Sequence, residues 1–248
     1  MKKIFALAMV CMLIAGVSSA MDAKELIEKN IEAMGGLDKI QAVKTMTATG
    51  KALAQGMEFP FEMKQARPNF LRLDVTVMGM QMVQAYDGEK GWAINPMMGS
   101  QDPQPMGDLE NKSFKMQADM DGPLINYEEK GYTVEYIGEA EVEGTPVYQL
   151  RLDTHMDIVI DMFFDQEYFL VIKQSSTINW EEKIIESDTY MSDFQEIGDG
   201  IIMPFAVETR MGENTVNQIV MEKVEHNMEF DESIFAMPAV EPAATETK

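Results

Sequence analysis

The stretch ARPNFLRLDVTVMGMQMVQAYDGEKGWAINPMMG, residues 66–99, contains three segments of strand length separated by turn residues. Apolar and polar residues alternate along it, which places every second side chain of a strand on the same face. Glycine-containing pairs interrupt the alternation and favour tight turns. The stretch therefore predicts an antiparallel meander, with strands at 69–77, 80–86 and 91–95 and turns at Met78-Gly79 and Asp87-Gly88.

The same alternation continues along most of the chain. Further strands are predicted near 45–54, 57–66, 133–140, 146–153, 157–165, 168–178, 182–197, 202–211 and 215–227. Eleven or twelve consecutive antiparallel strands are too many for a flat open sheet, so the sheet should curl. The predicted fold is mainly β (α+β): a strongly curved antiparallel sheet covered by helices.

Helical patterns are confined to the N-terminus and one central insertion. Asp22 is placed to cap a helix that carries Leu26, Ile27, Ile31 and Met34 at helical spacing and stops at Gly35-Gly36. Other short helical segments are predicted at 37–43, 113–120, 124–131 and 230–235, with a loop at 97–112.

The first twenty residues, MKKIFALAMVCMLIAGVSSA, have the pattern of a secretory signal peptide. Two lysines precede an apolar run that is too short to span a bilayer, and Ser18 and Ala20 fit a cleavage site. Cleavage would remove Cys11, the single cysteine, and would exclude thiol chemistry from the mature protein. We expect one domain over 21–238 and a disordered tail at 239–248.

The composition argues against several classes of function. The net charge is −22, or −24 once Lys2 and Lys3 leave with the signal peptide, so nucleic acid and anionic surfaces are repelled. No G-x-S-x-G elbow or phosphate-binding loop is present. His155 and His226, the two histidines, are expected to be solvated. The sequence predicts no catalytic residue and no cofactor.

A weak calcium-loop pattern lies in QADMDGPLINYEE. Asp119, Asp121, Gly122 and Glu128 occupy loop positions, but Gln117 stands where the first aspartate ligand belongs. A helix-to-helix turn explains the same residues, so no metal site is predicted there.

Methionine is unusually frequent, with 24 residues, three of them in the signal peptide. Met78, Met80 and Met82 share a face if they lie on one strand, whereas a turn at Met78-Gly79 leaves two on it. Most methionines are expected to fill the core in place of leucine. The rest fit either thioether coordination of Cu(I) or a deformable surface for apolar ligands. Other methionines are Met97, Met98, Met116 and Met120.

Two segments of the opening stretch resemble a known family. Arg67-Pro68-Asn69, followed by the D-G-x-x-x-W-x-x-N-P pattern of residues 87–96, is similar to the periplasmic lipoprotein carriers of the LolA/LolB type, the outer-membrane lipoprotein-sorting proteins. The resemblance implies a half-open β-barrel of about eleven strands with a helical lid and a single lipid-binding domain. Its apolar cavity would shield acyl chains of lipoproteins in the periplasm, between an inner-membrane release complex and an outer-membrane acceptor.

The resemblance also suggests lid and lipid-binding residues. Arg67 matches the arginine that holds the lid closed, and Leu71 matches an apolar cavity residue. Trp92 is expected to pack in the wall of the sheet, either as a plain core aromatic or against ligand. The other candidate lining residues are Met80, Met82, Met97 and Met98.

The sequence therefore favours a non-enzymatic carrier of acylated lipoproteins or other lipids. Sheltering a sixteen-carbon chain is worth about 12 kcal/mol at roughly 0.8 kcal/mol per CH₂, which an apolar cavity must supply. Two alternatives stay open: a lipid or envelope-stress sensor on the same fold, and a methionine-rich Cu(I)-binding protein.

Overall fold

A computed structural model describes residues 21–99, 101–181 and 183–239 of the chain. The predicted signal peptide lies outside these residues, and so does the predicted tail apart from its first residue. No helix of the described part is both long and apolar enough to cross a membrane.

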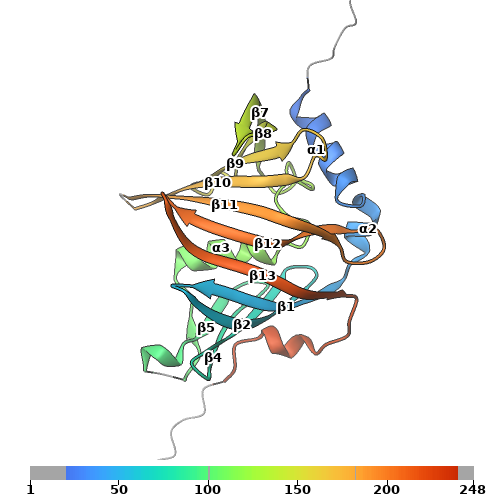
Figure 1. The fold of residues 1–248 in the computed structure, drawn as a ribbon. Coiled ribbons are helices and arrows are strands. Elements are labelled where there is room, and N and C mark those ends of the chain that lie inside the picture. The colour runs from blue at the N-terminus through green and yellow to red at the C-terminus, as the bar shows by residue number, and fades with distance from the viewer. Residues whose placement is uncertain (1–20, 100, 182, 240–248) are drawn as a thin grey trace, which may run out of the picture.

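The described residues form one antiparallel sheet of thirteen strands that curves around the molecule (Figure 1). The strands are β1 (Thr45–Ala54), β2 (Met57–Ala66), β3 (Phe70–Val77), β4 (Met80–Asp87), β5 (Gly91–Ile94), β6 (Gln104–Pro105), β7 (Thr133–Val142), β8 (Thr145–Asp153), β9 (Ile158–Asp165), β10 (Val171–Trp180), β11 (Lys183–Glu196), β12 (Ile202–Met211) and β13 (Asn214–His226). Strands that follow one another in sequence are paired, apart from β6 and β7, which form the two edges of the sheet. In addition, β1 pairs with β13. The predicted single, curled antiparallel sheet is confirmed.

The strand count exceeds the predicted number of about eleven. The added strand is β6, two residues within the predicted loop, where Gln104 and Pro105 pair with Ala93 and Trp92. Pro105 lacks a backbone N–H, so the pattern of this segment does not indicate a strand, and only its position beside β5 makes it one.

The helices are α1 (Ala23–Ala33), α2 (Leu37–Ala42) and α3 (Asp108–Ala118), with short 3₁₀ turns η1 (Pro96–Met98) and η2 (Glu232–Phe235). Asp22 caps α1 as predicted, because its Oδ1 accepts a hydrogen bond of 2.8 Å from the Glu25 N–H. Gly35 follows the helix with φ 117°, and a Cβ there would meet the Gly200 oxygen at 2.5 Å. Glycine is therefore needed where α1 ends against the 198–200 turn.

The central insertion departs from the prediction. The helix expected at 113–120 begins earlier, at Asp108, and the helix expected at 124–131 is a series of turns. Pro123 follows Gly122, whose φ is 67°, and Asn126 has φ 54°. These positive angles are incompatible with a continuous right-handed helix, which explains the wrong prediction.

The helices cover the inner face of the curved sheet. Leu26 and Ile27 of α1 join a core cluster with Leu150, Met162 and Phe164 of β8 and β9. Further along the sheet, Phe114 and Ala118 of α3 pack on Leu71 and Tyr86 of β3 and β4. Figure 1 shows α1 and α2 together at one side of the sheet, with α3 behind β12 and β13.

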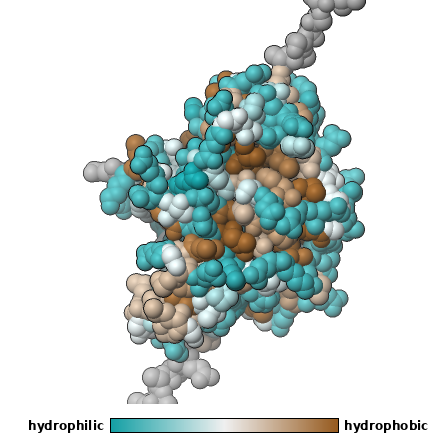
Figure 2. All heavy atoms as spheres, in the orientation of Figure 1, coloured by the Kyte–Doolittle hydropathy of each residue, from teal (hydrophilic) through white to brown (hydrophobic). Residues whose placement is uncertain are grey.

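Strand register identifies the residues that share the inner face. Met46, Gln65, Leu71 and Tyr86 are partners across β1 to β4, so their side chains lie on one side. The opposite face has its own apolar side chains: Figure 2 shows them gathered over β10 to β13 and surrounded by hydrophilic ones. The sheet thus has an inner face covered by helices and an outer face that is partly apolar.

Candidate functional site

A cavity of about 320 Å³ lies between the helices and the inner face of the sheet. One wall comes from α1, α2 and the 119–125 segment, and the other from β1, β2 and β9 to β12. Small-molecule sites of roughly 300–1,000 Å³ are typically apolar hollows with a few polar groups. The cavity is at the small end of that range.

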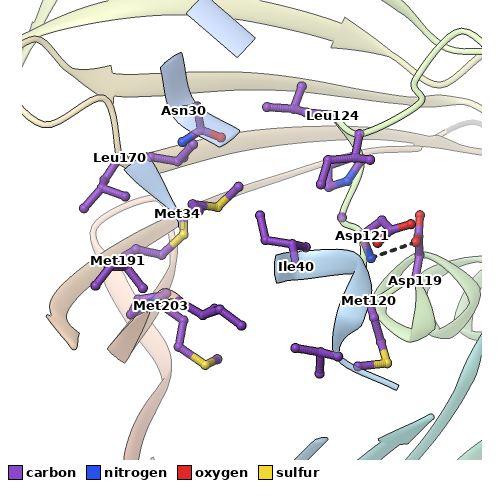
Figure 3. A pocket seen from close by; sticks show the side chains of 18 of the residues that line it. Asn30, Met34, Ile40, Asp119, Met120, Asp121, Leu124, Leu170, Met191 and Met203 are labelled. Carbon is purple, nitrogen blue, oxygen red and sulfur yellow. Dashed lines mark hydrogen bonds between the residues drawn. The ribbon is translucent and has the colours of Figure 1, made fainter. Parts of the chain in front are cut away.

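Methionine is the most frequent side chain in the cavity wall. Figure 3 shows Met34, Met191 and Met203 at one side and Met120 at the other, with Ile40 of α2 between them. The thioether is flexible and polarizable, so such a wall adapts to apolar ligands of different shape. The lining methionines are Met34, Met46, Met120, Met162, Met191 and Met203.

Two polar side chains in the wall are bound to backbone carbonyl groups. Asn30 Nδ2 donates to the Phe169 oxygen at 2.7 Å, and Gln65 Nε2 donates to the Gln117 oxygen at 2.8 Å. Both residues are buried, so an unpaired amide there would cost free energy. These bonds link α1 and the end of α3 to the sheet while the interior stays mainly apolar.

Arg67 connects the sheet to both parts of the covering wall. It lies in the turn between β2 and β3. Its Nε donates to the Val43 oxygen at 2.7 Å, and its Nη2 donates to the Ile40 oxygen at 3.1 Å and to Asp121 Oδ1 at 2.6 Å. The Arg67 and Asp121 side chains are only 19% and 15% exposed, so this charged pair is largely shielded from water. One guanidinium therefore holds α2 and the 119–125 segment together.

Three predicted lining residues lie on the inner face but outside this cavity. Leu71 is 3% exposed beneath α3. Met78 has φ 52° in a turn, so only Met80 and Met82 remain on β4. These two pair with Val77 and Val75, towards the turn between β3 and β4, and Met80 is 39% exposed.

Trp92 lies on the outer face of the sheet. It pairs with Ala85, which pairs with Arg72, and these residues alternate with the inner-face Leu71 and Tyr86. The indole is 1% exposed, and its Nε1 donates to the Phe235 oxygen at 2.7 Å. Here Trp92 packs in the wall of the sheet beneath the C-terminal segment.

Met97 and Met98 form η1 after β5 and are 54% and 84% exposed. Neither contributes to the cavity wall. The methionines that do so come from six separate elements or segments, which no local pattern connects. Of these six, Met34 lies on the apolar stripe of the predicted helix and Met120 is among the methionines noted near the central insertion.

The calcium-loop residues are engaged in ion pairs. Asp119 Oδ2 lies 2.5 Å from Lys130 Nζ, and Asp121 pairs with Arg67. Within the described ranges, no three His, Cys, Asp or Glu side chains are grouped to hold a metal ion.

The two histidines differ in their surroundings. The His155 side chain is 54% exposed, in line with the expectation of a solvated residue. The His226 side chain is only 14% exposed and lies 3.8 Å from the Asp199 carboxylate. The expectation of a solvated His226 is wrong, because the turn at Gly198 packs against its ring.

Solved structures with a similar fold are known, although the sequences differ widely. No protein-family model and no curated protein matches the sequence. A DUF1329 family protein of Desulfovibrio piger is 12% identical, covers 86% of this chain and 96% of its own, and superposes with a TM-score of 0.61. A LolA superfamily protein of Nitrosomonas europaea is 12% identical, with coverages of 88% and 98% and a TM-score of 0.59.

A third similar structure is a putative outer membrane lipoprotein-sorting protein domain of Vibrio parahaemolyticus. It is 10% identical, with coverages of 84% and 97% and a TM-score of 0.54. All three chains are matched over nearly their whole length, so the likeness concerns the complete sheet and its helices. Identities this low support the fold and carry no residue-level roles. The chain has a LolA-like fold.

Proposed function

We propose that this protein is a non-enzymatic carrier that shields an acyl chain of a lipoprotein or related lipid in the methionine-lined cavity. The observation that supports this most strongly is the partly open, mainly apolar cavity beneath a helical cover held by Arg67. The LolA-like fold is consistent with it, since one similar structure is named for lipoprotein sorting. The small volume favours one chain in the closed state rather than several.

The proposal includes a route for the ligand. The signal peptide at 1–20 would deliver the domain at 21–238 to the periplasm, where transfer to the outer membrane would need a donor complex and an acceptor. Release requires the cover to move away from the sheet, so α2 and the 119–125 segment are the parts expected to open. Arg67 would hold the closed form.

Identification of bound lipid gives the first test. The mature protein should copurify with acyl species that mass spectrometry detects after organic extraction. Tight Cu(I) binding by a preparation free of lipid would instead favour the metal-binding alternative.

A cavity-filling variant gives the second test. Met191→Trp adds volume at the cavity wall and should weaken binding of a fluorescent fatty acid about tenfold or more, since each 1.4 kcal/mol of lost binding free energy is tenfold. Met211→Trp is the matched control, because Met211 is 47% exposed and lies outside the wall. Equal affinities for both variants and the wild type would contradict the proposed ligand position.

A further inference from the structure

A second cavity, of about 360 Å³, adjoins the first. Asp119 and Pro123 line both, so the 119–123 segment is their common border. The second cavity lies between α3, the segment leading to β7, and the turn before β3, and its wall includes Asn69, Lys115, Lys130 and Tyr132. It is also lined by Met116 and Met156, but it differs from the first cavity in having lysine side chains in its wall.

Two lysines give the second cavity positive charge in a protein of net charge −22. Lys130 Nζ is held by Asp119 and by the Gly122 oxygen, at 2.5 and 2.6 Å. Lys115, on the exposed side of α3, forms no ion pair with any carboxylate of the described ranges. Because Lys130 forms its ion pair with Asp119, the ammonium group of Lys115 is the one able to bind an anionic ligand in this cavity.

Asn69 and Tyr132 add neutral polar groups to the wall, beside the apolar side chains of Met116, Pro123 and Met156. The Oδ1 atom of Asn69 is buried and has no hydrogen-bond partner among the described residues. A buried acceptor left unpaired costs about 1–3 kcal/mol, so a small shift of the Asn69 side chain that brings Oδ1 to a ligand hydroxyl would be stabilising. Burial and the nearby Asp119 raise the pKa of the Tyr132 phenol, which keeps it protonated as a donor at neutral pH. The cavity thus offers donors for an anionic oxygen and an acceptor for a hydroxyl.

We propose that the second cavity binds the phosphate-bearing, hydroxyl-containing head of the lipid whose acyl chain occupies the first. This inference rests on the proposed carrier function and names the class of lipid. The high negative charge does not oppose it, because repulsion from distant surface charges is screened beyond about 8 Å at physiological salt, whereas Lys115 would contact the head directly. The same charge would limit adsorption of the whole protein to an anionic membrane.

Two lipids with the same twelve-carbon chain but different heads allow the contribution of the head to binding to be measured separately from that of the chain. Lysophosphatidylglycerol carries a phosphate and hydroxyl groups, whereas monoacylglycerol carries hydroxyl groups alone. Calorimetric titration below the critical micelle concentration should show tighter binding of the phosphate lipid to the wild type. Lys115→Gln should weaken binding of this lipid about tenfold, the effect of one charge-assisted contact, and leave monoacylglycerol unchanged. Tyr132→Phe should show the same selectivity with a smaller loss.

Lys223→Gln is the matched control, since it removes one positive charge from an exposed side chain that lines neither cavity. It should bind both lipids as the wild type does. Equal losses in the Lys115 and Lys223 variants, or no selectivity between the lipids, would overturn the head-binding proposal and leave the carrier function standing. Failure of both lipids to bind the wild type would instead overturn the carrier function. Binding of inorganic phosphate at micromolar concentration in the absence of lipid would assign the cavity to a free anion and would also overturn the proposal.

Discussion

Arg67 makes three hydrogen bonds to three different residues, and two of them lie in the moving part that the proposed mechanism requires. A guanidinium presents its donors in a planar fork, whereas lysine has a single ammonium. Proline at position 68 biases Arg67 away from helical conformations, which keeps it in the turn beside β2. The local sequence thus determines the position of Arg67, whereas its hydrogen-bond partners are brought to it by the tertiary structure.

Removal of this fork should speed the opening of the cover. Charge-assisted hydrogen bonds contribute roughly 1.5–3 kcal/mol, so Arg67→Leu should increase the rate of lipid handover to acceptor vesicles about tenfold or more. Arg67→Lys keeps the charge beside Asp121 and should give an intermediate rate. Stopped-flow transfer of a fluorescent acylated peptide measures both. Loading and handover equal to those of the wild type would remove Arg67 from the mechanism.

Glu208 on the outer face makes stability depend on pH. Hydrogen bonds from Arg210 and then Thr215 lower the pKa of its carboxyl from 4.5 to about 2. Because the folded-state pKa is below the unfolded value, the stabilisation is fully present above pH 4.5 and is lost as the pH falls towards 2. In Glu208→Gln the free energy of unfolding should therefore decrease less between pH 5 and pH 2 than in the wild type. Urea titrations across this range provide the measurement, and parallel pH profiles would contradict the assignment.

At the scale of elements, the C-terminal segment closes the outer face of β3 to β5. Phe235 is fully buried, stacks on Phe70 with ring centroids 5.3 Å apart, and offers its carbonyl to Trp92. Arg72 donates to the neighbouring Ile234 oxygen at 2.8 Å. A short 3₁₀ turn is thereby fixed by side chains from strands about 140 to 165 residues earlier.

Phe235→Ala should destabilise the protein by about 3–5 kcal/mol, the usual cost of truncating a buried aromatic side chain. Met237→Ala, two residues later, should cost well under 1 kcal/mol because Met237 is 40% exposed. Denaturant unfolding of the two variants tests the difference. A loss below 1 kcal/mol at Phe235 would show that the segment covers the sheet without stabilising it.

Local sequence predicted most strands and two of the helices, because their signals are short-range. Asp87-Gly88 marks its turn by composition alone, and Asp22 caps α1 by a bond within one helical turn. The cavity could not be found in this way, because Met34 at the end of α1 meets Met191 and Met203 of β11 and β12 only in the tertiary structure. The candidate methionines between residues 80 and 98 are close together in sequence, but closeness in sequence does not determine which side chains line a cavity.

At the scale of the molecule, the β1–β13 pairing makes one sheet from two meanders. Its register runs from Met46 with His226 to Leu53 with Gln218, so the two halves share a long seam. Contacts between residues so distant in sequence form slowly and late, because loop closure is unfavourable before they form. The halves share their hydrogen bonds along this seam and should unfold together.

The two tryptophans report on the two halves. Trp92 lies in β5, and Trp180 lies at the end of β10. Trp92→Phe leaves Trp180 as the fluorescence reporter, and Trp180→Phe leaves Trp92. In both variants, the urea midpoint measured by fluorescence should coincide with the midpoint measured by far-UV circular dichroism, as expected for a single cooperative transition. A fluorescence midpoint that precedes the circular dichroism midpoint in either variant would indicate that one half unfolds alone.

The sheet does not close, and β7 is left with an unpaired edge. This edge could recruit a strand from another molecule and start a growing aggregate. Glu135, Glu139 and Glu141 alternate along its exposed side, and a register shift between Tyr136 and Gly138 bends it. Like charges would face each other in any antiparallel pair of two such edges. The proposed carrier function requires a protein that stays dispersed with an insoluble cargo, and these charges protect the exposed β7 edge against self-association.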